Sequence, residues 1–140
     1  MRAEVFMELY EKMSAMIDTK KLQIIKLKES ATKTTVQGFE ERVQSSGSKD
    51  KIGNAVADYT DKERELQWEV NDCQRVQTEI EKLLECLPTA EYKVLYKRYV
   101  ECKELYIIAD EVNKSYSWVS KNKRKGLKHV QEILDEREKR

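Results

Sequence analysis

Residues 105–128, LYIIADEVNKSYSWVSKNKRKGLK, contain two helical patterns separated by a tight turn. The first helix has one apolar face, formed by Leu105, Ile108, Ala109 and Val112. The small Ala109 suits a point where two helices approach closely, and Asn113 tolerates the left-handed backbone of a tight turn. Ser115 is placed to cap the second helix, because its hydroxyl oxygen can accept a free backbone N–H. The stretch therefore predicts two short helices that pack across a turn.

Positive charge is concentrated on the second of these helices. The stretch from Lys114 to Lys128 contains six basic residues and no acidic one, whereas the whole chain has 27 basic and 26 acidic residues. Val119 and Leu127 are the expected inward positions of this helix. A basic helix of this kind is often only a solvated surface. On the second helix of a helix-turn-helix pattern, however, such residues favour phosphate contacts, and we expect DNA binding.

A wider segment resembles a known family. Residues 87–127, LPTAEYKVLYKRYVECKELYIIADEVNKSYSWVSKNKRKGL, are similar to the region-four helix-turn-helix of bacterial sigma factors, and more closely to the phage-encoded sigma-like regulators of the ArpU and RinA type. The matching positions are Leu95, Arg98, Tyr99, Val100, Ile108-Ala109, Ser115-Tyr116, Trp118-Val119 and Gly126-Leu127. With the upstream segment KIGNAVADYTDKERELQWEV, the likeness covers about residues 45–134.

The resemblance implies a sequence-specific transcriptional regulator of phage or prophage type that activates late genes. A recognition helix at about residues 115–128 would enter the major groove of double-stranded DNA. Ser115 and the helix N-terminus are expected to hold a phosphate. The residues expected to face bases or groove walls are Tyr116, Ser117, Ser120, Lys121 and Arg124. Those expected to anchor the backbone are Lys114, Lys123, Lys125 and Lys128.

The sequence also departs from the family pattern. Asn122 stands where the family usually has an apolar residue, and Glu104 to Ile107 replace Thr-Trp and two polar residues. Asn122 keeps open an alternative function, in which the chain is a protein-interaction module that binds RNA polymerase or another phage protein through its coiled coil, with weak or lost DNA binding. Trp118 is either a lid over the small core or a phosphate contact.

Composition indicates an all-α, cytoplasmic protein, and the resemblance implies a bacterial host cell. Charged residues make up 38% of the chain, with one proline and four glycines, against about 25% charged residues in typical domains. We expect no sheet, and the apolar runs are too short to span a membrane. No phosphate loop or nucleophile motif is present, so we do not expect an enzyme.

The cysteines do not indicate a metal site or a cofactor. Cys73, Cys86 and Cys102 have no CxxC spacing, and the single histidine, His129, is distant in sequence. Cys73 falls on an apolar stripe and is expected to be a buried thiol in a reducing compartment.

The N-terminal part predicts a long helical hairpin or coiled coil. One seam has members four and three residues apart: Ile52, Val56, Tyr59, Glu63, Leu66, Val70, Cys73, Gln77, Ile80, Leu84 and Leu87. A second stripe, on a helix of about 28 residues, consists of Phe6, Tyr10, Met13, Ile17, Ile24 and Leu27. Between them, a segment rich in Ser, Thr and Gly predicts a loop at about residues 30–50.

Pro88 is the expected boundary between the hairpin, residues 1–87, and a helix-turn-helix domain, residues 88–134. A charged tail, residues 135–140, is expected after this domain. A helix over about residues 89–101 should complete the small core. Because the first helix is expected to be shorter than the seam of the second, part of that seam is left free to pair with a second copy. We therefore expect a homodimer; a monomeric hairpin is the alternative.

Overall fold

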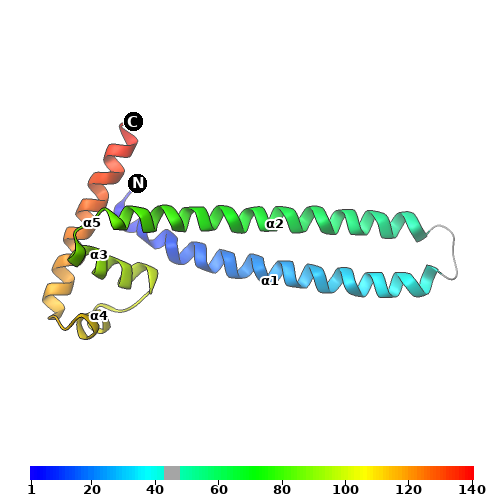
Figure 1. Cartoon of the computed structure of the whole chain (residues 1–140), viewed down its shortest axis with the longest axis horizontal. Helices are drawn as coiled ribbons and strands as arrows, with labels where there is room; N and C mark the ends of the chain where they lie inside the picture. Colours follow the sequence, from blue (N-terminus) through cyan, green and yellow to red (C-terminus); the bar gives the residue numbers. More distant parts are fainter. Residues whose placement is uncertain (43–47) are drawn as a thin grey trace. The chain divides into compact units, whose positions relative to one another are not determined.

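The computed structural model describes residues 1–42 and 48–140, and the side chains of residues 1–32 and 58–140. The helices are α1 (Ala3–Arg42), α2 (Ser48–Glu85), α3 (Thr89–Leu95), the π-helical turn η1 (Tyr96–Val100), α4 (Leu105–Val112) and α5 (Tyr116–Glu138) (Figure 1). The described part contains no strand, so the all-α expectation is confirmed there. No helix among these residues has both the length and the apolar character needed to cross a membrane.

The chain forms two compact units. Unit 1 contains residues 1–14 and 74–140, and unit 2 contains residues 15–73, so α1 and α2 contribute to both. The boundaries between the units lie within α1 and α2, whereas the sequence predicted a boundary at Pro88. The physical reason is that the first part of α1 and the last part of α2 share a core with the C-terminal helices.

Unit 1 is built around that shared core. Its buried members are Ala3, Phe6 and Met7 from α1; Ile80, Leu83 and Leu84 from α2; Leu87, which follows α2; Leu95 from α3; Tyr99 from η1; and Val130 and Leu134 from α5. The side chain of Gln131 also joins α5 to the start of α1. Its Oε1 accepts the Ala3 N–H at 2.7 Å, and its Nε2 donates to the Met1 carbonyl at 3.0 Å. This contact satisfies one of the N–H groups that the first turn of a helix leaves free.

Pro88 starts α3 as expected. The last turn of α2 tightens, with Leu87 N–H bonded to the Leu84 carbonyl at 3.0 Å. Pro88 then precedes α3 without needing an N–H of its own, and its carbonyl accepts the Tyr92 N–H at 2.9 Å. The expected helix over residues 89–101 is present as α3 followed by η1.

In unit 2, α1 and α2 run antiparallel. Lys20 pairs with Glu69 at 2.7 Å, and Lys28 pairs with Glu63 at 3.4 Å. A higher residue number in α1 is therefore paired with a lower residue number in α2, as antiparallel helices require. Ile17 and Ile24 of α1 and Val70 and Cys73 of α2 are buried in this unit. The expected apolar stripes are therefore buried or half-buried wherever side chains are described; Ile52 and Val56 lie outside that range.

The expectation of a loop at about residues 30–50 is wrong where the structure describes these residues. α1 continues to Arg42 and α2 begins at Ser48, and residues 43–47 lie outside the described range. α1 therefore has 40 residues and α2 has 38, which removes the length difference on which the dimer through the seam was argued. The charged segment that starts at residue 135 continues α5, which ends at Glu138.

Candidate nucleic-acid interface

The turn between α4 and α5 is fixed by backbone hydrogen bonds. Asn113 has φ 56° and ψ 43°, the left-handed conformation expected from its residue type. The Lys114 N–H donates to the Ala109 carbonyl at 3.1 Å, and the Asn113 N–H donates to the Asp110 carbonyl at 3.4 Å. These two bonds close the end of α4 and set the direction in which the chain enters α5.

Ser115 caps α5. Its backbone is extended, with φ −72° and ψ 156°, and its Oγ accepts the Trp118 N–H at 3.1 Å. The expected N-cap is therefore confirmed. The remaining free N–H groups of the first turn give this end of α5 a partial positive charge.

A small core holds α3, α4 and α5 together. Val94, Ile108, Ala109 and Val119 are its buried members, and Leu105, Val112 and Trp118 pack against it. Trp118 is half-buried, with the Lys114 ammonium 5.7 Å from the centroid of its ring. The ring of Trp118 covers the edge of the core, as one of the two roles considered from the sequence requires, and it also holds a cation at the start of α5.

The exposed face of α5 carries a row of polar and basic side chains. Ser117, Lys121, Arg124 and Lys128 are all exposed and are spaced four, three and four residues apart, which places them on one side of a helix. We call these four residues the basic row. Lys128, expected only as a backbone anchor, belongs to this row.

The other candidate residues lie around the basic row. Lys114, Ser115, Tyr116 and Lys125 are exposed. Ser120 and Lys123 are half-buried, because they lie closer to the packed side of α5, where Val119 and Gly126 are buried. The expectation that Ser120 faces outward like its neighbours therefore needs correction.

The basic residues from Lys114 to Lys128 lack carboxylate partners among the described residues, whereas nearby basic residues have them. Lys97 and Lys103 both pair with Glu111, at 2.9 and 2.6 Å, and Lys103 also pairs with Glu101 at 2.8 Å. The hydrogen bonds that Lys103 donates to Glu101 and Glu111 raise the pKa of Lys103, and the hydrogen bonds that Glu111 accepts from Lys103 and Lys97 lower the pKa of Glu111. In contrast, no base from Lys114 to Lys128 makes an ion pair with a carboxylate in the described part of the chain.

The packed side of α5 holds contacts that the sequence did not suggest. Gly126 lies against Leu95 of α3, and the Nδ1 of His129 is 2.5 Å from the Oε2 of the buried Glu91. The amide of Asn122 donates to the Trp118 carbonyl at 2.9 Å. Asn122 is therefore satisfied within its own helix and does not leave an unpaired polar group in the packed face.

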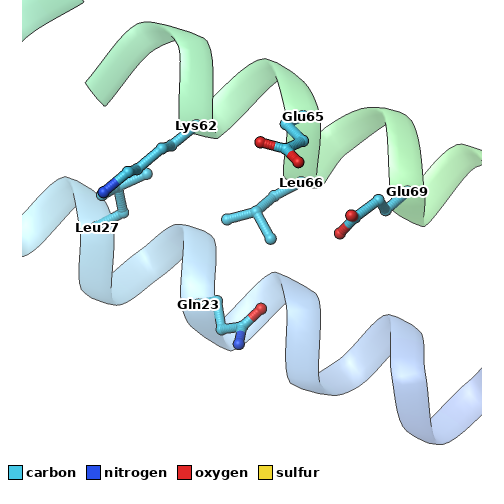
Figure 2. A pocket seen from close by; sticks show the side chains of 6 residues that line it. All are labelled: Gln23, Leu27, Lys62, Glu65, Leu66 and Glu69. Carbon is cyan, nitrogen blue, oxygen red and sulfur yellow. The ribbon is translucent and has the colours of Figure 1, made fainter. Parts of the chain in front are cut away.

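A groove in unit 2 offers no comparable arrangement. Figure 2 shows it between α1 and α2, lined by Gln23, Leu27, Lys62, Glu65, Leu66 and Glu69. Its volume is about 420 Å³. Glu69 is already paired with Lys20, so Lys62 and Glu65 are its remaining charged groups.

Metal-binding and thiol groups are scattered. Within the described ranges, no three His, Cys, Asp or Glu side chains come together as a metal site. Cys73 is buried, as expected, while Cys86 and Cys102 are exposed free thiols.

Comparisons with protein-family models, with curated proteins and with solved structures found no match.

Proposed function

We propose that the chain is a sequence-specific regulator of transcription that binds double-stranded DNA, as the resemblance to phage sigma-like proteins implies. In this proposal α4, the turn at Asn113 and α5 form a helix-turn-helix. The long helices α1 and α2, which precede it in the chain, form a helical hairpin. The observation that carries the proposal is the basic row, whose bases have no carboxylate partner among the described residues and lie on the exposed face of a capped helix.

The proposed roles follow from position. The free N–H groups at the start of α5, together with Lys114 held over Trp118, would bind a backbone phosphate. Lys121 and Arg124 lie in the middle of the basic row, where a helix in the major groove presents side chains to base edges. Lys125 and Lys128 would contact phosphates on the groove walls.

A second candidate function is supported by the exposed face of α4. Tyr106 is 62% exposed and Ile107 is 37% exposed, while Glu104 precedes the helix without forming a side-chain cap. An apolar, acidic face of this kind suits a protein partner such as RNA polymerase better than a phosphate backbone. In that case the chain would be an interaction module with weak DNA binding.

Salt dependence of binding to random-sequence duplex DNA tests the first proposal. The test variant replaces Lys121, Arg124 and Lys128 with Ala. Its matched control replaces Lys12, Lys82 and Lys93, which are exposed bases of unit 1 on α1, α2 and α3, and so changes the net charge equally. Each lost phosphate contact should lower the log–log salt slope by about 0.9. On random-sequence DNA no base is preferred, so all three cations are expected to contact phosphates. We therefore expect a slope lower by up to roughly 2.7 in the test variant and little change in the control.

Fluorescence anisotropy at about 50 and 200 mM salt measures this slope, and circular dichroism checks that both variants remain helical. Equal losses in the test variant and the control would mean that binding follows net charge alone and would contradict the assignment of the basic row. A wild-type protein with negligible affinity at low salt would favour the interaction module, and replacing Tyr106 and Ile107 with Ser should then weaken binding to RNA polymerase.

A further inference from the structure

The exposed side of the first half of α5 carries no carboxylate and no exposed amide. From Tyr116 to Lys128 its exposed residues are Tyr116, Ser117, Lys121, Arg124, Lys125 and Lys128. Lysine and arginine side chains carry hydrogen-bond donors only. The one amide in this stretch, that of Asn122, is half-buried and already donates to the Trp118 carbonyl at 2.9 Å. This part of α5 therefore lacks the exposed carboxylate and amide groups with which proteins read cytosine and adenine.

Acidic residues mark the end of the basic row. Beyond Lys128 the next exposed residues of α5 include Glu132 and Asp135, whose carboxylates would repel backbone phosphates. Val130 and Leu134, in the same part of the helix, are buried in the shared core of unit 1. The part of α5 that can face DNA is therefore its first half, and a recognition helix contacts base edges with its N-terminal residues.

Lys121 and Arg124 are spaced to reach neighbouring base pairs. They are three residues apart, which corresponds to a rise of about 4.5 Å along a helix, and successive bases of a DNA strand are about 3.4 Å apart. The flexible stems of the two side chains can close this small difference. Ser117 lies four residues before Lys121, and its hydroxyl both donates and accepts, so it does not select one base.

Guanine is the base that a side chain with donors only prefers. Its major-groove edge offers two acceptors, N7 and O6, whereas adenine and cytosine each present an amino donor there and thymine offers one acceptor beside a methyl group. We propose that α5 selects two adjacent G·C base pairs, with Arg124 donating to one guanine and Lys121 to the next. The planar guanidinium of Arg124 can donate to both acceptors at once, so its position should be the more selective. This choice of bases rests on the proposed DNA binding and adds which bases are read.

Selection of duplexes from a random-sequence library by the purified protein tests the choice of bases. The wild type should enrich two adjacent G·C pairs. Arg124→Ala should lose the preference at one of these positions, and Lys121→Ala at the neighbouring one. Lys128→Ala is the matched control, because it removes the same charge from an exposed position at the end of the basic row. It should weaken binding to all sequences and keep both preferences.

Modified bases test the contact atoms. Replacing one guanine with 7-deazaguanine removes its N7 acceptor and keeps the Watson–Crick pair, whereas replacing it with inosine removes only an amino group in the minor groove. At the guanine read by Arg124, 7-deazaguanine should weaken wild-type binding by about 5-fold or more. The same change should leave the affinity of Arg124→Ala unaltered, and inosine should have little effect on either protein.

Two results would overturn the proposal while leaving DNA binding intact: an enriched site without adjacent G·C pairs, or an equal loss with 7-deazaguanine in the wild type and in Arg124→Ala. Failure of the wild type to bind any duplex at low salt would instead contradict the proposed function. Circular dichroism checks that each variant remains helical. The comparison of 7-deazaguanine with inosine needs only the wild type, so it decides the question even where a variant is unstable.

Discussion

Gly126 lies where α3 packs directly on the backbone of α5. A Cβ atom at this position would be 2.7 Å from Leu95 Cδ1 and 3.4 Å from Glu91 Cβ. Leu95 and Glu91 are both buried, so neither can move aside without disturbing the core. We expect Gly126→Val to lower the free energy of unfolding by about 1–3 kcal/mol through overpacking. Chemical unfolding followed by circular dichroism measures the change.

Glu132→Val is the control for Gly126→Val, because it places the same β-branched residue at an exposed position of α5. Its effect on stability should be limited to helix propensity, within about 0.5 kcal/mol. If both variants lost the same stability, the contact between Gly126 and Leu95 would not constrain α3.

Two tyrosines of unit 1 should make the protein sensitive to alkaline pH. Burial raises the pKa of Tyr99 to about 12, and burial with a hydrogen bond to Glu81 raises the pKa of Tyr10 to about 12. Because these folded-state values exceed the unfolded value near 10, the stabilisation is complete below that pH and is lost as pH rises towards 12. Tyr99 would account for up to roughly 2 kcal/mol.

Unfolding by urea at about pH 9 and pH 11.5 tests this expectation, because these values lie on either side of the window in which free tyrosine ionises. The wild type should lose more stability between them than a protein with Tyr99→Phe and Tyr10→Phe. A double variant with the same loss of stability would show that other groups cause the alkaline sensitivity.

At the scale of elements, the turn at Asn113 sets how α5 leaves α4. Its left-handed backbone costs a residue with an ordinary side chain roughly 1–2 kcal/mol. We therefore expect Asn113→Ala to destabilise unit 1 by about 1 kcal/mol and Asn113→Gly to be neutral or slightly stabilising. Thermal unfolding of the two variants gives the comparison. Equal stability of the two would mean that the turn adapts and does not hold α5 in place.

The turn and the apolar faces of the helices could be predicted because each depends on residues close in sequence. Asn113 and Ser115 take their expected conformations, and the stripes of α1 and α2 recur every three or four residues, a period that survives whatever packs against them. Pro88 likewise acts through its own missing N–H. Local chemistry determines these features, so one sequence suffices to predict them.

The lengths of α1 and α5 could not be predicted in the same way. Ser, Thr and Gly near residue 40 favour a loop by composition, but helix propensity is a weak preference that a long helix can override. The pair of Glu91 and His129 could not be predicted at all, because the two residues are 38 positions apart and meet only when α3 packs on α5. The same is true of Ala3 and Gln131.

At the scale of the whole molecule, the order in which a ribosome delivers the chain bears on the shared core of unit 1. Residues 15–73 are contiguous, so unit 2 can form as soon as they emerge. Phe6 and Met7 are synthesised long before Val130 and Leu134, with which they share a core. The start of α1 therefore lacks its full core until α5 has emerged, and during that interval its apolar side chains are open to chaperones or to aggregation.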